Sequence, residues 1–190
     1  MVITIVLAVG VFLYFFVRLF LWIKYRAFSI KESKDLTRKI IFFTVDFCII
    51  TAVIFQLIAP NFWKIDIGSS SNAVRMFGLS IFVIGIIIAT WGRLLLGQNW
   101  QPAICYEIGV EQKLVTTGLF SKMRHPIYSG MILMGFGFEL VLNSWLILAI
   151  VPLVFILYQQ AKLEEKLLGN YYPSYQEYKA RSWMFVPKIF

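Results

Sequence analysis

Charged residues are scarce in this sequence of 190 residues. Lys, Arg, Asp and Glu together make up 15% of it, against about 25% in typical soluble domains. Hydrophobic residues make up 59%, so the few polar groups could not cover the apolar surface of a water-soluble fold. This composition excludes a soluble globular enzyme and a disordered chain, and it favours a bundle of membrane helices.

Histidine and cysteine are also rare, with one His and two Cys in the sequence. Two cysteines do not form a disulfide framework. Cys48 lies inside an apolar run, which predicts a buried thiol, and neither it nor Cys105 is expected to bind metal. No cluster of His, Cys and carboxylates has metal-ligand spacing, and no nucleophile–base–acid set is visible. The basic residues lie in short segments between apolar runs, so the net charge of +8 indicates membrane topology and no nucleic acid.

Five apolar segments account for most of the chain. The first three cover residues 2–23, 40–59 and 76–96, and each reaches the ~20 residues that a transmembrane helix needs. The next stretch, from Ile127 to Tyr158, is too long for one span, and Asn143 and Ser144 interrupt it. Two further spans, 127–142 and 145–160, should therefore form a helical hairpin. The prediction is an all-α integral membrane protein of five spans in a single domain, 1–190.

Basic residues alternate between the segments that connect these spans. They are frequent after the first, third and fifth spans, few after the second, and absent from the hairpin turn. Cytoplasmic loops carry the excess of Lys and Arg, which predicts an N-terminus outside and a C-terminal segment in the cytoplasm. The polar segments 97–126 and 159–190 then share the cytoplasmic face and can form one site.

The most informative polar stretch surrounds the only histidine. Arg124 and His125 precede Pro126, and proline is favoured in the first turn of a helix. Free backbone N–H groups at such a position suit a carboxylate or a phosphate, although anchoring at lipid headgroups explains the basic pair equally well. Glu164 and Glu165, just beyond the fifth span, are the matching candidates for a cation. The alternative is that they are solvated helix-end charges.

Two acidic residues fall inside predicted spans. A charge in hydrocarbon is costly, so Asp46 and Glu139 are candidates for a functional role. Each is otherwise protonated or paired with an arginine such as Arg18 or Arg93. The tyrosine-rich tail after residue 170 is typical of the aromatic belt at a membrane interface.

Taken together, these motifs resemble the isoprenylcysteine carboxyl methyltransferase family. The resemblance covers roughly residue 91 to the C-terminus, while the first two spans match only in being hydrophobic. The wider group includes phospholipid N-methyltransferases, and a related signature occurs in membrane sterol reductases that use NADPH. The matching segments are 96–100, 114–120, 124–130, Glu164 and Glu165 with Leu168, and 172–175 with Tyr178, Arg181 and Pro187.

The resemblance implies that S-adenosylmethionine binds within residues 97–190, at the cytoplasmic face, and that its methyl group goes to the carboxylate of an isoprenylcysteine-like acceptor. This lipophilic small molecule or lipidated peptide would enter from the bilayer, in contact with membrane lipids. No metal is implied. The residues that match the family's cofactor contacts are Gln112, Lys113, Leu114, Val115, Phe120, His125, Pro126, Ile127, Tyr128, Glu164 and Glu165.

One position departs from the family pattern. Eukaryotic members carry an arginine four residues before the first glutamate, where this sequence has Gln160. Arg181 is therefore the candidate to meet the acceptor carboxylate, and Arg124 and Arg181 are the expected catalytic residues. His125 is expected to position the cofactor and not to act as a general base. Phospholipid or amine N-methylation, NADPH-dependent reduction and a non-catalytic membrane protein remain the alternatives.

Overall fold

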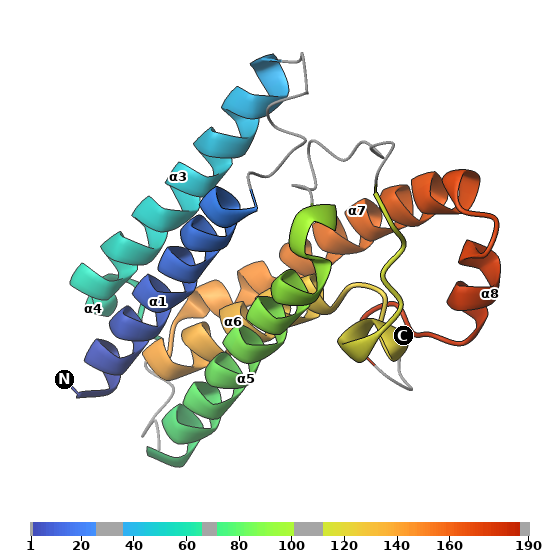
Figure 1. Ribbon diagram of the computed structural model, residues 1–190. Helices are drawn as coiled ribbons and strands as arrows, with labels where there is room; N and C mark the ends of the chain where they lie inside the picture. Colours follow the sequence, from blue (N-terminus) through green and yellow to red (C-terminus); the bar gives the residue numbers. More distant parts are fainter. Residues whose placement is uncertain (1, 26–35, 66–71, 101–111, 187–190) are drawn as a thin grey trace.

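The computed structural model describes residues 2–25, 36–65, 72–100 and 112–186, and every regular element within these ranges is a helix. The thiol Cys105 and the tail residue Pro187 lie outside the described residues. The long helices are α1 (Val2–Lys24), α3 (Leu36–Ile58), α5 (Asn72–Leu96), α6 (Pro126–Leu142) and α7 (Ile150–Tyr171). The short ones are α4 (Pro60–Trp63), η1 (Gly97–Asn99), η3 (Gly118–Ser121), η4 (Trp145–Ala149) and α8 (Tyr175–Ala180) (Figure 1).

Three segments of the described helices are long and apolar enough to cross a membrane: Ile3–Leu21, Asn72–Asn99 and Trp145–Tyr171. Thr44–Ile58 and Pro126–Leu142 are apolar but shorter. Large apolar side chains also face outward, such as Phe12 on α1 and Phe47 on α3, which are 68% and 70% exposed. These features are those of a membrane protein. The five-span topology remains a prediction, because the two shorter helices do not reach the length of the other three.

Cys48 corrects one expectation. Its side chain is exposed on α3 and not buried in a core. Apolar neighbours in the sequence predicted burial, but in a membrane helix an apolar face can point to lipid as well as to protein.

Small residues bring α5 and α6 into close contact. A β-carbon added at Gly85 would lie 2.4 Å from the backbone nitrogen of Met134, and one at Gly137 would lie 2.4 Å from that of Phe82. The backbones can approach this closely because glycine has no side chain, which is how membrane helices gain packing contacts where lipid is as apolar as leucine. The two helices form the most extensive contact between elements of the described chain.

The turn after α6 lies where the sequence predicts the hairpin. Asn143 adopts a left-handed conformation with φ 56° and caps α6, and its N–H donates to carbonyls of the last turn. Ser144 then accepts a hydrogen bond from the N–H of Leu146 at 3.1 Å and starts η4, from which the chain returns as α7. Asparagine tolerates this backbone conformation better than most residues.

Both acidic residues within the apolar helices have partners. Asp46 on α3 forms an ion pair with Arg18 on α1 at 2.8 Å, which confirms one of the two arginines proposed for this role. Glu139 on α6 instead accepts a hydrogen bond from Gln56 on α3 at 2.6 Å. These contacts tie α3 to its neighbours and satisfy groups that would be costly in hydrocarbon.

Candidate functional site

One cavity connects the apolar helices with the C-terminal segment. Its wall is built by α1, α3, α5, α6, α7 and α8, together with residues 99–100, 112–115, 120 and 124–125 from the segments between these helices. The part contributed by α1 and α3 is mostly apolar and includes Phe15, Leu21 and Ile49. The wall is therefore polar in one part and apolar in another, as a site for an amphipathic ligand requires.

Most of the predicted site residues line this cavity. Glu165 and Arg181 do not, and Arg181 is exposed at the end of α8. The position of Arg181 offers no support for its predicted contact with an acceptor, which stays a prediction. The lining residues among those predicted are Gln112, Lys113, Leu114, Val115, Phe120, Arg124, His125, Pro126, Ile127, Tyr128 and Glu164.

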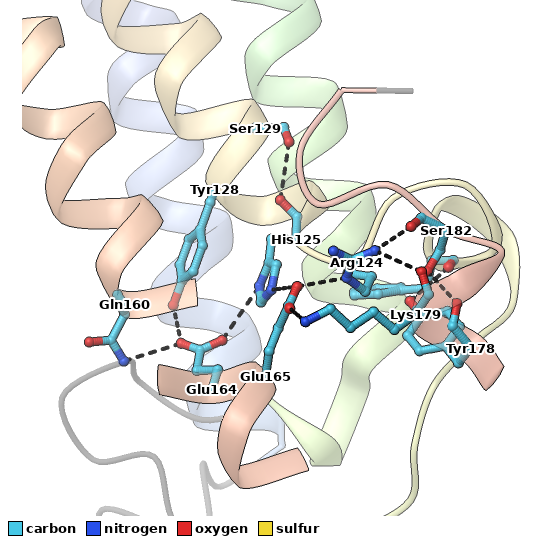
Figure 2. Close-up of polar contacts among 11 residues, drawn as sticks. Arg124, His125, Tyr128, Ser129, Gln160, Glu164, Glu165, Tyr178, Lys179 and Ser182 are labelled. Atoms are coloured by element: carbon cyan, nitrogen blue, oxygen red, sulfur yellow. Dashed lines mark hydrogen bonds and ion pairs between the residues drawn. The ribbon is translucent and has the colours of Figure 1, made fainter. Parts of the chain in front are cut away.

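Glu164 lines the cavity from the C-terminal half of α7, and Figure 2 shows its contacts. The hydroxyl of Tyr128 donates to its Oε1, and the side-chain amide of Gln160 donates to the same oxygen at 3.3 Å. Nδ1 of His125 lies 3.6 Å from Oε2. Among the described residues no Lys or Arg pairs with this carboxylate, so no such side chain competes with a bound cation for it.

Glu165, the next residue on α7, lies on the other side of the His125 ring from Glu164, next to the cations Arg124 and Lys179 (Figure 2). Its Oε1 accepts a hydrogen bond from Nε of Arg124 at 2.6 Å, and its Oε2 lies 2.8 Å from Nζ of Lys179. Arg124 also donates through Nη1 to the carbonyl oxygen of Ser182. The side chains of Arg124 and Glu165 are only 8% and 3% exposed. This buried pair joins α7 to the start of α6, and its further contacts with Lys179 and Ser182 attach the C-terminal segment to the same point.

Backbone hydrogen bonds fix the same junction. The N–H of Arg124 donates to Trp183 O at 2.8 Å, and the N–H of His125 donates to Met184 O at 3.0 Å. These two donors lie just before α6, where no helical carbonyl can accept them, and the tail satisfies them. The hydroxyl of Ser129 also donates to Phe185 O at 2.8 Å. The returning tail is therefore fixed against the start of α6.

His125 is held between these two glutamates. It is the N-cap residue of α6, and its ring stacks on that of Tyr128 with the ring centroids 5.4 Å apart. Its Nε2 is buried and makes no hydrogen bond within the described chain, although Glu165 Oε1 lies 3.5 Å away. The imidazole is thus fixed in orientation, with Nε2 next to Glu165, and the residue lines the cavity.

Tyrosines of the tail anchor the segment before α6. The hydroxyl of Tyr172 donates to Gln112 O at 2.5 Å, and that of Tyr178 donates to Phe120 O at 2.8 Å. Burial raises the pKa of Tyr178 to about 12, so the phenol stays a neutral donor. Tyr175 and Tyr178 are 1% and 3% exposed. An exposed interfacial belt is therefore the wrong interpretation for these two residues.

Some residues of the site were not predicted to belong to it. Lys179 contacts Glu165 only because the tail folds back after α8. Arg93 and Trp100 line the cavity from α5 and the residue after η1, and Asn99 accepts the N–H of Lys113 at 2.9 Å. Segment 96–100 belongs to the family resemblance, but its place beside 112–115 depends on tertiary contacts.

Several curated proteins are similar to this chain in sequence. The cobalt-zinc-cadmium resistance protein CzcN of Cupriavidus metallidurans is 31% identical over 58% of this chain and 50% of its own length. Protein-S-isoprenylcysteine O-methyltransferase B of Arabidopsis thaliana is 29% identical over 61% of this chain and 60% of its own length. The corresponding Saccharomyces cerevisiae enzyme is 24% identical over 75% and 61%. This chain therefore spans about half to three fifths of the curated relatives it matches.

A solved structure has the same fold. It is that of the eukaryotic intramembrane Ras methyltransferase ICMT, and the match has a TM-score of 0.59 at 20% identity, covering 93% of this chain and 65% of that one. A family model described as phospholipid methyltransferase matches residues 74–174, more than half of the sequence. The chain belongs to the phospholipid methyltransferase family.

Proposed function

We propose that this protein transfers a methyl group from S-adenosylmethionine to a lipophilic acceptor, namely the carboxylate of an isoprenylcysteine-like molecule. The observation that carries the proposal is the shared cavity. Its wall contains Glu164, a buried carboxylate without a Lys or Arg partner in the described chain, and also the apolar faces of α1 and α3. The two plant and yeast relatives, whose names state isoprenylcysteine O-methylation, support the same reaction.

The side chains fit this cofactor. S-adenosylmethionine carries an ammonium and a sulfonium, and Glu164 provides the carboxylate that would stabilise them. His125 Nε2 is buried without a hydrogen bond and could contact a polar group of the cofactor. Phe120 lines the cavity and offers an aromatic surface for stacking. When bound, the cofactor supplies an already activated methyl group.

The protein's contribution is then to align and to desolvate the reactants. Orientation within a closed site can supply much of the rate of such a transfer. A carboxylate acceptor does not need to lose a proton, so no general base is required. His125 therefore serves as a positioning residue. Arg124, predicted as catalytic, binds both Glu165 on α7 and the carbonyl of Ser182, and so holds the tail next to the site.

The topology that we propose has five spans, with the N-terminus outside and the site in the cytoplasm. Cysteines introduced at Lys122 and Asn170, in a chain without its two native thiols, should react with an impermeant maleimide only from the cytoplasmic side. Labelling of either position only from outside would overturn this topology.

N-methylation of a phospholipid amine is the second candidate, because the matching family model is described as phospholipid methyltransferase. The two products differ chemically. A methyl ester releases its label as methanol in mild base, whereas an N-methyl group is stable.

The decisive experiment uses the purified full chain in lipid nanodiscs with labelled S-adenosylmethionine. N-acetyl-S-farnesylcysteine and phosphatidylethanolamine are offered separately as acceptors. We expect base-labile label on the first.

Glu164→Gln should weaken cofactor binding by roughly 1.5–3 kcal/mol, the contribution of a hydrogen bond to a charged group. Glu177→Gln is the matched control because Glu177 is exposed on α8. Binding of NADPH instead of S-adenosylmethionine would refute the proposal in favour of a reductase, and binding of neither would favour a non-catalytic protein.

A further inference from the structure

Arg93 lies near the end of α5 and faces the same cavity. It is 6% exposed. A β-carbon at the preceding residue, Gly92, would lie 3.2 Å from Cγ of Pro126 and 3.1 Å from Cγ1 of Ile127. Arg93 is therefore level with the first turn of α6, where His125 and the proposed cofactor contacts begin.

The guanidinium of Arg93 is held firmly. Its Nη1 donates to Gly97 O at 2.8 Å. Its central carbon lies 4.3 Å from the ring centroid of Trp100 and 5.5 Å from that of Tyr25. Stacking on aromatic faces and a carbonyl contact fix its plane but do not neutralise its charge.

No carboxylate within the described chain pairs with Arg93. Of the acidic residues that line the cavity, Asp46 is taken by Arg18, and Glu164 contacts Tyr128 and Gln160. Nη2 of Arg93 is buried and has no hydrogen-bond partner there. A buried, fixed and uncompensated guanidinium is costly, and it is suited to bind the oxygens of an anion.

From this geometry we infer that Arg93 binds the anionic group of the lipophilic methyl acceptor, whose apolar chain lies along α1 and α3. The inference rests on the proposed function and names a specificity-determining residue within it. An acceptor carboxylate and the phosphate of a phospholipid headgroup share the required chemistry.

The position of Arg93 favours the acceptor over the cofactor. Its aromatic neighbour Tyr25 directly follows α1, and α1 contributes Phe15, Val17 and Leu21 to the cavity wall. The proposed cofactor contacts come instead from residues 112–128 and from α7. Arg93 thus lies where the apolar part of the wall meets the polar part. The anionic group of an amphipathic molecule would lie at this boundary.

The test compares anionic ligands with uncharged ones of the same shape. N-acetyl-S-farnesylcysteine is paired with its carboxamide, and dioctanoyl phosphatidic acid is paired with dioctanoylglycerol. Dissociation constants are measured in nanodiscs without cofactor, by the change in tryptophan fluorescence, for wild type, Arg93→Gln and Arg93→Lys. Lys166→Gln is the control, because Lys166 is exposed on α7 and does not line the cavity. S-adenosylmethionine binding is measured separately on each variant and reports whether the fold is intact.

We expect Arg93→Gln to weaken the anionic member of one pair at least tenfold and to leave its uncharged partner unchanged. Arg93→Lys should lie between, and the pair that responds identifies carboxylate or phosphate. Equal affinity of wild type and Arg93→Gln for both anions would overturn the inference. So would an equal loss for charged and uncharged partners, which indicates a packing role, or a loss confined to S-adenosylmethionine, which assigns Arg93 to the cofactor. Failure of wild type to bind S-adenosylmethionine would instead refute the proposed function.

Discussion

Replacing Glu165 by Gln should loosen the C-terminal segment from the start of α6. The change keeps an oxygen that can accept from Arg124 but removes the charge that Arg124 and Lys179 face at 2.6 and 2.8 Å. Breaking a buried ion pair by altering one partner typically costs 3–5 kcal/mol. Arg124 retains its bond to the carbonyl of Ser182, and Lys179 is 46% exposed and can turn to solvent. We therefore expect the loss of stability at this junction to lie at the lower end of that range, at about 3 kcal/mol.

Hydrogen exchange measured by mass spectrometry reports this loss directly. The amides of Arg124, His125 and Trp183 are bonded across the junction, to Trp183 O, Met184 O and Lys122 O. If the tail opens locally, a loss of about 3 kcal/mol speeds exchange of these amides by about a hundredfold. Peptides from the α5–α6 contact, whose bonds do not depend on the tail, should exchange at the wild-type rate.

Glu177→Gln is the control, since it removes the same charge from an exposed position on α8. Exchange in Glu165→Gln that matches this control would refute the view that the Arg124–Glu165 pair holds the tail. The adjacent Glu164→Gln should show the opposite phenotype, with weaker cofactor binding and a protected junction. If both glutamine variants behaved alike, the two residues would not have the separate roles that their contacts indicate.

Three further predictions address other parts of the molecule. His125→Asn, which keeps a side-chain donor, should retain more S-adenosylmethionine affinity than His125→Ala; normal affinity with lost turnover in His125→Ala would make this residue a base. Gly85→Ala should destabilise the protein by about 1–3 kcal/mol through overpacking. Gly135→Ala, whose β-carbon would meet only the side-chain ends of Ile150 at 3.1 Å and Leu153 at 3.9 Å, should destabilise it less, as measured by thermal denaturation. Tyr178→Phe should lower stability by about 1–3 kcal/mol at neutral pH because Phe120 O loses its donor. The pKa of Tyr178 is raised to about 12, so its contribution is full below the unfolded value near 10 and is lost as the pH rises toward 12; a pH-independent gap would contradict this.

Local signals in the sequence predict the hairpin well. Pro126 begins α6 because the first turn does not need its missing N–H, and Asn143 ends it in a left-handed conformation that few residues tolerate. Both effects depend on the residue and its immediate neighbours. The site motifs between residues 112 and 128 are found for a similar reason, since the family pattern is contiguous there.

Which groups contact Glu164 and which contact Glu165 depends on the fold, and the sequence could not predict it. Glu164 and Glu165 are neighbours in sequence, but the helix turns successive side chains by about 100°. Glu164 therefore faces the cavity and Glu165 faces Lys179, which comes near only when the tail returns after α8. The exposure of Cys48 was missed because hydropathy does not tell a face that packs on protein from one that meets lipid.

The distribution of buried charge limits what the cavity can bind. Of the three buried residues Arg93, Glu164 and Glu165, only Glu165 has a Lys or Arg partner in the described part of the chain. Arg93 and Glu164 line one cavity, yet no ion pair joins them. Arg93 is carried by α5 and Glu164 by α7, and both side chains line the cavity, so a ligand bound there can meet both. The space between them then favours ligands that place a cation at Glu164 and an anion at Arg93. A cationic methyl donor beside an anionic lipophilic acceptor satisfies both charges at once, which neither ligand does alone.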